Sequence, residues 1–305
     1  MSYIIEQVVN GIKKYIPESE IALNEPMKKH TTFRVGGDAE IFVSPSATEV
    51  KDLIDLCNDL EVPYHVVGNG SNLLVSDQGL KGVVISVRRN AEYIDIKGDT
   101  IITGAGSSLA KVANFAAKEG LGGLEFAAGI PGTIGGAIVM NAGAFGGEIK
   151  DVLVSVKVCT KDGQVLEIKA QDLDLSYRHS CILEKEYIVL EATFKLKEAN
   201  KDEIYATMDD YKKRRISSQP LNFPSAGSTF KRPKDNFAGK LIEDAGLKGY
   251  KIGGAQVSEK HCGFVVNSNA ATATDVYELI KYVISIVKTK YDVTLEPEVK
   301  MMGEF

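Results

Sequence analysis

The chain has 305 residues, of which 44% are hydrophobic and 25% are charged, and its net charge is −5. These ordinary globular values fit about two domains and exclude a long disordered or collagen-like chain. One dense basic run, at residues 212–215, is interpreted as a solvated helix face, so no nucleic-acid partner is expected.

The N-terminal residues 1–16 have apolar positions at helical spacing, which favours an amphipathic helix over a signal peptide. No apolar stretch approaches the ~20 residues that a membrane-spanning helix needs. We therefore expect a cytoplasmic protein without a membrane partner. The cysteines are far apart and form no CxxC pair, which predicts buried free thiols and no zinc site at Cys57, Cys159, Cys181 and Cys262.

Strand-like and helix-like segments alternate along the chain, which predicts an α/β or α+β protein. Strands are expected at 39–43, 63–68, 82–87, 152–158, 187–196 and 293–300, and helices at 46–61, 107–119, 200–217 and 274–291. Ser46 and Glu49 have the spacing of a capping box. The pattern of residue types changes near residue 200, which indicates a domain boundary there. We expect a first region, 1–197, with subdomains 1–90 and 91–197, and a second domain, 198–305.

Glycine is dense in three segments, 31–37, 67–77 and 129–147. Glycine allows positive φ and lets a ligand approach backbone amides, as a diphosphate cofactor requires. Tight turns would explain any one segment equally well, but the three together favour a nucleotide cradle. Leu73 and Leu109 stand where the last glycine of a G-x-G-x-x-G fingerprint would be, so a Rossmann site is not expected.

Five motifs occur in order over nearly the whole chain: GNGSNLLVSD (68–77), GIPGTIGGAIVMNAGAFG (129–146), SYRHS (176–180), PSAGSTFKRP (224–233) and LEPEVK (295–300). This series resembles the UDP-N-acetylenolpyruvoylglucosamine reductase family. The resemblance implies an α+β protein with an FAD-binding fold of the vanillyl-alcohol-oxidase/PCMH type, made of two subdomains, and a C-terminal α+β substrate domain. It also implies reduction of an enolpyruvyl ether on a UDP-sugar, with NADPH as reductant and non-covalent FAD as hydride carrier.

The residues that match the family's cofactor motifs lie in the glycine-rich segments. They are Thr32, Arg34, Gly68, Asn69, Gly70, Ser71, Asn72, Leu73, Gly129, Pro131, Gly132, Thr133, Gly135, Gly136, Asn141, Ala142, Gly143 and Gly146.

Three residues match the family's catalytic positions, and each type suits its implied task. Arg178 can bind the substrate carboxylate with its planar guanidinium. Ser228, with Ser225 as the weaker alternative, is the implied proton donor. Glu298, with Glu296 as the alternative, can donate a hydrogen bond to developing negative charge if it is protonated. Outside the motif context, each would be interpreted as an ordinary surface or turn residue.

Contacts to the UDP diphosphate are expected from Lys231 and Lys300, with Lys260 and His261 as weaker candidates. The chain departs from the family pattern at Arg232, where asparagine is common, and at Lys300, where arginine is common. No metal is expected, since no histidine stands in a metal-ligand pair. Tyr177 or Tyr187 could line the site, but core packing is the favoured role for both.

Two other functions are compatible with the glycine loops. One is a different oxidoreductase on the same FAD scaffold, and the other is a non-catalytic flavin-binding or nucleotide-binding module. Neither requires the polar residues Arg178, Ser228 and Glu298. A monomer is expected.

Overall fold

The computed structural model describes residues 3–88 and 91–305. The chain forms two compact units, each built from separate stretches of sequence. Unit 1 comprises 1–23, 41–69 and 82–213, and unit 2 comprises 24–40, 70–81 and 214–305. The chain therefore passes from one unit to the other several times.

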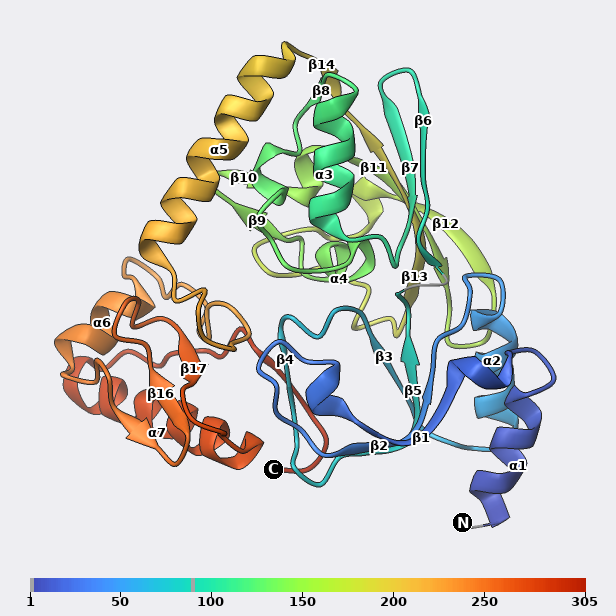
Figure 1. Ribbon diagram of the computed structural model, residues 1–305, viewed down its shortest axis with the longest axis horizontal. Helices are drawn as coiled ribbons and strands as arrows, with labels where there is room; N and C mark the ends of the chain where they lie inside the picture. Colours follow the sequence, from blue (N-terminus) through green and yellow to red (C-terminus); the bar gives the residue numbers. More distant parts are fainter. Residues whose placement is uncertain (1–2, 89–90) are drawn as a thin grey trace. The chain divides into compact units, whose positions relative to one another are not determined.

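Unit 1 contains two principal sheets, with strand orders β1-β2-β5-β3 and β12-β11-β13-β7-β6 (Figure 1). Strands β1, β2 and β5 extend at one end into the segments of unit 2. The strands of the first sheet are β1 (Ile21–Pro26), β2 (Asp38–Val43), β5 (Leu80–Ser86) and β3 (Tyr64–Val67). Those of the second are β6 (Ile94–Lys97), β7 (Thr100–Gly104), β11 (Leu153–Cys159), β12 (Val165–Lys169) and β13 (Ile188–Lys195).

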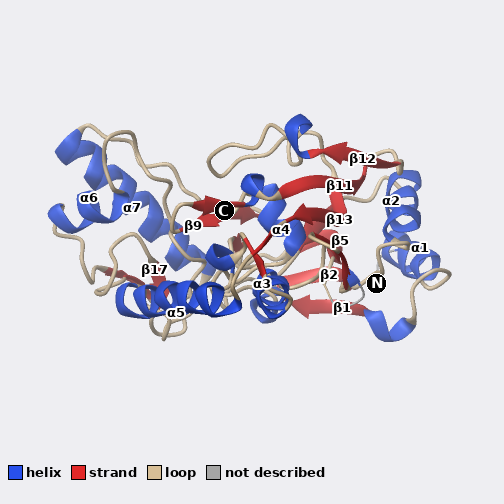
Figure 2. Cartoon of the chain, turned by 90° about the horizontal axis from the view of Figure 1, so that it is seen from above, coloured by secondary structure: helices blue, strands red, loops and turns tan. Residues whose placement is uncertain are grey.

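The helices of unit 1 cover these sheets. Helices α1 (Tyr3–Ile12) and α2 (Val50–Asp59) lie side by side (Figure 2), while α3 (Leu109–Lys118) follows β7, and α4 (Ile134–Val139) packs on β7 and β13. Short paired strands complete the unit: β8 (Leu121–Gly122) with β14 (Lys197–Glu198), and β9 (Gly143–Ala144) with β10 (Gly147–Glu148). One continuous hydrophobic core joins both sheets to the helices, from Ile12 and Leu53 to Val156 and Phe194.

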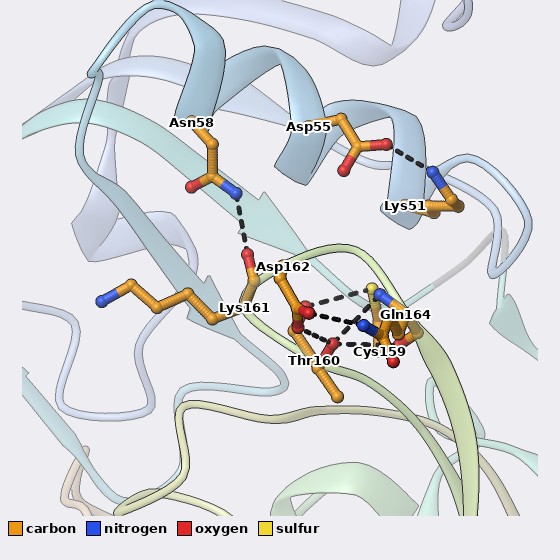
Figure 3. A network of polar contacts seen from close by, with 8 residues as sticks. All are labelled: Lys51, Asp55, Asn58, Cys159, Thr160, Lys161, Asp162 and Gln164. Carbon is orange, nitrogen blue, oxygen red and sulfur yellow. Dashed lines mark hydrogen bonds and ion pairs between the residues drawn. The ribbon is translucent and has the colours of Figure 1, made fainter.

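A tight turn at residues 160–164 joins β11 to β12 and lies against α2 (Figure 3). The Asn58 amide donates to the Lys161 carbonyl at 2.7 Å, and the Thr160 hydroxyl accepts from the backbone N–H of Gln164 at 3.0 Å. Cys159, at the start of the turn, is buried, and burial raises the pKa of its thiol. All of the predicted free cysteines are buried and unpaired, as expected.

Unit 2 is a small α+β unit around helix α7 (Ala273–Tyr291), which packs across the sheet β15-β16-β17 and against α6 (Ala238–Asp244) (Figure 1). The strands are β15 (Lys251–Ile252), β16 (Ala255–Val257) and β17 (Val265–Asn267). A second pair, β4 (Leu73–Val75) and β18 (Lys300–Met302), runs parallel. The core of the unit includes Phe33, Val35 and Leu74 from the N-terminal stretches. Helix α5 (Lys201–Ser218) leads into the unit.

Most predicted elements are present, with two differences in extent. Helix 46–61 is shorter, because the chain at Ser46–Glu49 forms a turn before α2. The Glu49 carboxylate accepts from the Ser46 N–H at 2.7 Å, but among the described residues the Ser46 hydroxyl accepts no hydrogen bond from the Glu49 N–H, so the capping box is incomplete. The predicted N-terminal helix begins at Tyr3 as described and ends at Ile12, and residues 1–2 lie outside the described residues.

The strand predicted at 293–300 is wrong over most of its length, because regular strand begins only at Lys300. Pro297 has no N–H to give a ladder, and the segment pairs with its neighbour through a single bridge between Phe230 and Pro297. The substrate domain predicted at 198–305 stays a prediction. The compact units divide the chain within α5, between Lys213 and Arg214.

Candidate active site

In unit 1, two of the glycine-rich segments meet at Thr133. A Cβ on Gly68 would overlap the Thr133 hydroxyl, so this approach requires a bare backbone. Thr133 caps α4 by accepting from the Gly136 N–H at 3.3 Å. The backbone of 104–109, which sequence reasoning set aside with the Rossmann fingerprint, pairs with the same segment through Ile134 N–H to Ser107 and Gly135 N–H to Ala105, both at 2.9 Å.

The remaining predicted cofactor residues of unit 1 follow in the same segment. Gly129, Pro131 and Gly136 are exposed, which leaves the outer side of the turn accessible. Gly143 and Ala144 pair with Glu148 and Gly147 in a tight hairpin, and the two turn residues, Phe145 and Gly146, have φ of 54° and 92°. The Phe145 ring stacks on Tyr211 with centroids 4.4 Å apart.

Asn141 holds this hairpin to the motif that carries Arg178. It is fully buried with φ of 38°, and its amide donates to the Glu148 carboxylate at 2.8 Å and to the Ser176 carbonyl at 3.0 Å. Its carbonyl accepts from the Lys150 N–H at 3.0 Å. A separate hydrogen bond, from the Lys150 side chain to the Glu148 carboxylate, is the main cause that holds the pKa of Glu148 below its ordinary value.

Arg178 lies in a two-residue turn closed by reciprocal bonds between Ser176 and His179, each 3.2 Å long. Its φ is 55°, and its guanidinium donates to the Gly143 carbonyl at 3.3 Å and stands over the Tyr177 ring at 5.1 Å from the centroid. The structure thus brings the predicted catalytic arginine into contact with the predicted cofactor residue Gly143. Tyr187 packs against the core of unit 1, as expected, whereas Tyr177 is 47% exposed, so the expectation of core packing is wrong for that residue.

In unit 2, Gly70 lies where the chain folds back on 30–32. Its φ is 61°, and a Cβ there would overlap the His30 carbonyl oxygen. The Thr32 hydroxyl donates to the Ser225 carbonyl at 2.6 Å, and the Thr32 N–H donates to the Gly70 carbonyl at 3.2 Å. A predicted cofactor residue therefore fixes the loop that carries Ser228. Arg34 is exposed, and Ser71, Asn72 and Leu73 are half-buried.

The segments of Ser228 and Glu298 lie side by side. The Glu298 N–H donates to the Thr229 carbonyl and the Lys231 N–H to the Glu296 carbonyl, both at 2.8 Å. Asn72 holds the second segment, because its side-chain amide donates to the Glu298 backbone carbonyl at 3.0 Å and its backbone carbonyl accepts from the Lys300 N–H at 2.9 Å. Predicted catalytic, cofactor and substrate residues thus share one backbone network.

The side chains of this network differ in their partners. Lys231 donates to the Glu296 carboxylate, and Ser228, beside Gly227 with φ of 74°, makes no side-chain hydrogen bond within 3–88 and 91–305. The His261 Nδ1 accepts from the Gly263 N–H at 3.1 Å, and burial lowers the pKa of the ring. A neutral ring bonded in this way carries its proton on Nε2 and can donate from that atom. Lys260 instead donates to the Ile216 carbonyl at 2.6 Å.

The basic run at residues 212–215 was interpreted as a solvated helix face. Lys212 and Lys213 are exposed, but Arg215 is half-buried, so the interpretation is wrong for that residue.

Models of known families match both parts of the chain. The model of an FAD binding domain matches residues 39–169, and that of the UDP-N-acetylenolpyruvoylglucosamine reductase C-terminal domain matches residues 219–302. A UDP-N-acetylenolpyruvoylglucosamine reductase of Agathobacter rectalis is 51% identical over 309 residues, which cover 97% of this chain and 98% of that protein. The chain belongs to the UDP-N-acetylenolpyruvoylglucosamine reductase family. The protein of that name from Lachnoclostridium phytofermentans is 49% identical, with 97% of each chain covered.

Solved structures agree with membership of this reductase family. The UDP-N-acetylenolpyruvylglucosamine reductase of Thermus caldophilus has a TM-score of 0.80 and 38% identity, covering 93% of this chain and 98% of that one. The pollen allergen Phl p 4 has a TM-score of 0.51 at 14% identity over 64% of this chain and 44% of that one, a likeness of fold alone. The α+β, vanillyl-alcohol-oxidase type of fold predicted from the sequence is confirmed.

The protein is therefore an enzyme, an FAD-dependent oxidoreductase of this family. The residues present in unit 1 fit a bound dinucleotide, because Gly129 and Gly136 are exposed and a Cβ on Gly146 would meet no protein atom within 4 Å, so a ligand can approach the backbone of this glycine-rich segment. Among the described residues, no group of three or more His, Cys, Asp or Glu side chains could hold a metal ion. Nor does the described part of the chain contain a helix both long and apolar enough to cross a membrane.

Proposed function

We propose that the protein reduces the enolpyruvyl group of UDP-N-acetylglucosamine enolpyruvate to give UDP-N-acetylmuramate, a peptidoglycan precursor, with NADPH as reductant. Family membership supports the reaction, and the network that aligns the segments of Ser228 and Glu298 beside Lys231 and Lys300 supports the roles given to residues below. FAD, when bound without a covalent link, carries hydride between the two nucleotides.

Arg178 is proposed to bind the substrate carboxylate. Its turn geometry and its bond to Gly143 limit the positions of the guanidinium, and a preorganised guanidinium binds a planar carboxylate with two parallel hydrogen bonds. As a hydride reaches the terminal carbon of the enolpyruvyl group, negative charge develops on the adjoining carbon and its carboxylate. The fixed positive charge stabilises that species.

Ser228 is proposed to deliver the proton that completes the reduction. Its hydroxyl is free of other hydrogen bonds within the described residues, and the glycine before it gives the loop a conformation that other residues rarely adopt. Glu298, whose segment is bonded to Thr229, is proposed to assist in the protonated form by donating to the developing charge.

The diphosphate and sugar are proposed to contact Lys231, His261 and Lys300. The Lys231 ammonium group has three N–H donors. One of them donates a hydrogen bond to Glu296, so the others remain for phosphate oxygens. His261 offers a neutral Nε2–H donor. The remaining expectations, a monomer in the cytoplasm, are part of the same proposal.

The test separates the two half-reactions in the purified holoenzyme. In Ser228→Ala, NADPH should reduce the flavin at nearly the unaltered rate, while reoxidation by the enolpyruvyl UDP-sugar should slow by about 10² to 10⁴, the range of general-acid contributions. Ser225→Ala is the matched control and should leave both rates within twofold. Stopped-flow absorbance of the flavin measures each rate.

The same experiment discriminates the alternatives. Reoxidation of Ser228→Ala at the unaltered rate would remove the serine from the mechanism. If the reduced flavin is not reoxidised by the UDP-sugar but is reoxidised by an aldehyde or ketone, the result would favour another oxidoreductase on this fold. Absence of any turnover with bound flavin would contradict the proposed reaction.

A further inference from the structure

Thr229, which directly follows the proposed proton donor Ser228, has a polar side chain in the interior of unit 2. Its side chain and backbone have no exposed surface, and both Phe230, the next residue, and Val265, to which it is bonded, belong to the apolar core of the unit. A hydroxyl group in such surroundings costs free energy unless a hydrogen bond compensates for the loss of water. Here the hydroxyl oxygen accepts from the Val265 N–H at 2.9 Å.

The backbone of Thr229 divides its hydrogen bonds between two neighbouring segments. In a regular strand, the N–H and the C=O of one residue face the same neighbouring strand. At Thr229 they face different ones, because the N–H donates to the Gly263 carbonyl, whereas the carbonyl accepts from the Glu298 N–H, both at 2.8 Å. The chain therefore bends directly after Ser228, and this bend turns the Thr229 carbonyl toward Glu298.

The bend deprives the Val265 N–H of its regular acceptor. In a parallel pair of strands, a residue that donates to Gly263 would accept, at its own carbonyl, from the N–H two residues further on, which is that of Val265. The Thr229 hydroxyl stands in for this carbonyl. Because Val265 is only 1% exposed, its N–H would otherwise be buried without an acceptor, which is unfavourable.

The hydroxyl therefore decides which of two donors the Thr229 carbonyl serves. With the hydroxyl present, Val265 is satisfied and the carbonyl is left for Glu298. Without it, the carbonyl would turn back toward Val265 and release the Glu298 N–H. The bond from the Lys231 N–H to the Glu296 carbonyl would remain, so the two segments would stay together but lose their alignment at the end that carries Ser228 and Glu298.

We propose that Thr229 is a positioning residue for the protonation step, because its hydroxyl takes the Val265 N–H and so leaves the Thr229 carbonyl to hold Glu298 beside Ser228. The inference rests on the proposed function, in which Ser228 delivers the proton and protonated Glu298 assists. Since Thr229 has no exposed surface, it acts through these two residues and not by contact with a ligand. Its loss should therefore slow one half-reaction and spare the other.

The test follows both half-reactions of the purified holoenzyme by stopped-flow absorbance of the flavin. Thr229→Val keeps the shape of the side chain and removes the acceptor. Reduction by NADPH should stay within about twofold, whereas reoxidation by the enolpyruvyl UDP-sugar should slow by about tenfold to a hundredfold, the effect of a small misplacement of reacting groups. Thr229→Ser keeps the acceptor and should reoxidise within about threefold of the unaltered rate.

Thr160→Val is the matched control. It removes a hydroxyl that likewise accepts from a backbone N–H, that of Gln164 at 3.0 Å, in the 160–164 turn of unit 1 (Figure 3). It should cost stability through the same kind of lost bond and leave both flavin rates within about twofold.

A second readout distinguishes positioning from general destabilisation. In a Ser228→Ala background, Thr229→Val should slow reoxidation by less than about threefold more, because the group that it positions is already absent. The inference would be overturned by a full additional loss in the double variant, by an unaltered rate in Thr229→Val, or by equal losses in Thr229→Val and Thr229→Ser.

Thr229→Cys covers the case in which Thr229→Val does not fold with bound flavin. Cysteine has a similar volume and is only a weak acceptor, so reoxidation should be slower than in Thr229→Ser, and equal rates would contradict the inference. Failure of the proposed function gives a different pattern, because Ser228→Ala itself would then be reoxidised at the unaltered rate. Slow reoxidation in Ser228→Ala together with an unaltered rate in Thr229→Val would overturn this inference alone.

Discussion

At the scale of single residues, backbone conformation and contact distance decide which glycines are irreplaceable. Gly70 and Gly98 have nearly the same φ, 61° and 60°, but different surroundings. A Cβ on Gly70 would overlap the His30 carbonyl oxygen, whereas one on Gly98 would meet nothing within 4 Å. Comparing substitutions at Gly70 and Gly98 therefore distinguishes the cost of backbone strain from the cost of steric overlap.

Gly98→Ala should therefore cost only the strain of a left-handed residue, about 1–2 kcal/mol. Gly70→Ala adds displacement of the 30–32 backbone, and with it the Thr32 bond to the Ser225 carbonyl. We expect a larger loss of stability in Gly70→Ala and a lower ratio of bound flavin to protein, measured by chemical unfolding and by absorbance. Equal losses in the two variants would contradict this explanation.

Asn141 carries three hydrogen bonds that align the Arg178 turn with the 143–148 hairpin. Asn141→Ala loses all three and places alanine at positive φ, so a destabilisation of roughly 3–5 kcal/mol is expected. Asn114→Ala, which removes one exposed bond to the Ala110 carbonyl, is the control and should cost less than about 1 kcal/mol. Urea unfolding of the holoenzyme measures both, and similar values would refute the structural role of Asn141.

At the scale of elements, local signals predicted most helices but gave no prediction of which strands pair. Gly120, with φ of 76°, ends α3 as expected, and the Asn200 side chain accepts from the Asp202 N–H at 2.8 Å at the start of α5. The parallel pairing of β4 with β18 joins residues far apart in sequence, and no local pattern contains it. For the same reason the motif series named site residues, while the network of Asn72, Thr229 and Glu298 required the structure.

The N-terminus of α7 makes a prediction about pH. Thr272 and Asp275 form a capping box, and Asp275 also accepts from the Gly254 N–H at 3.1 Å. Burial acts to raise the pKa of Asp275, but hydrogen bonds from the Thr272 and Gly254 backbone outweigh burial and lower it. The carboxylate therefore stabilises the fold fully above the unfolded-state pKa of about 3.9, and this contribution is lost as pH falls through the lower, folded value.

Asp275→Asn should accordingly lower the unfolding temperature at pH 7, by an amount equivalent to about 0.5–2 kcal/mol, and the difference from the unaltered protein should shrink as pH falls toward about 3. Glu278→Gln, in an exposed pair with Lys281 on the same helix, should follow the unaltered protein throughout. Thermal unfolding at several pH values checks the trend, and a difference that grows with acidity would show the wrong sign.

At the scale of the whole molecule, the two compact units do not follow the order of the sequence. The composition change near residue 200 predicted a C-terminal domain of 198–305, but the core of unit 2 also contains Phe33, Val35 and Leu74. Residue composition along the chain shows where the local sequence pattern changes. It carries no information on which distant segments pack together.

A fragment of residues 198–305 should therefore fail to fold cooperatively, because it lacks Phe33 and Leu74, both fully buried, and the partner strand of β18. Removing a buried phenylalanine side chain alone typically costs about 3–5 kcal/mol, a large part of a small domain's stability. Circular dichroism and dispersion of amide NMR signals would test the fragment, with the full chain as reference. A folded fragment would show that the N-terminal stretches are dispensable.

The parallel pairing of β4 with β18 has a consequence during translation. Residues 73–75 leave the ribosome early, while their partners at 300–302 follow only after most of the chain has been made. Until then the side chains of Leu74 and Val75, which are buried in the folded protein, and an unsatisfied strand edge face solvent, an arrangement prone to association with other chains. Chaperone dependence of the nascent polypeptide should therefore persist until synthesis has passed Met302.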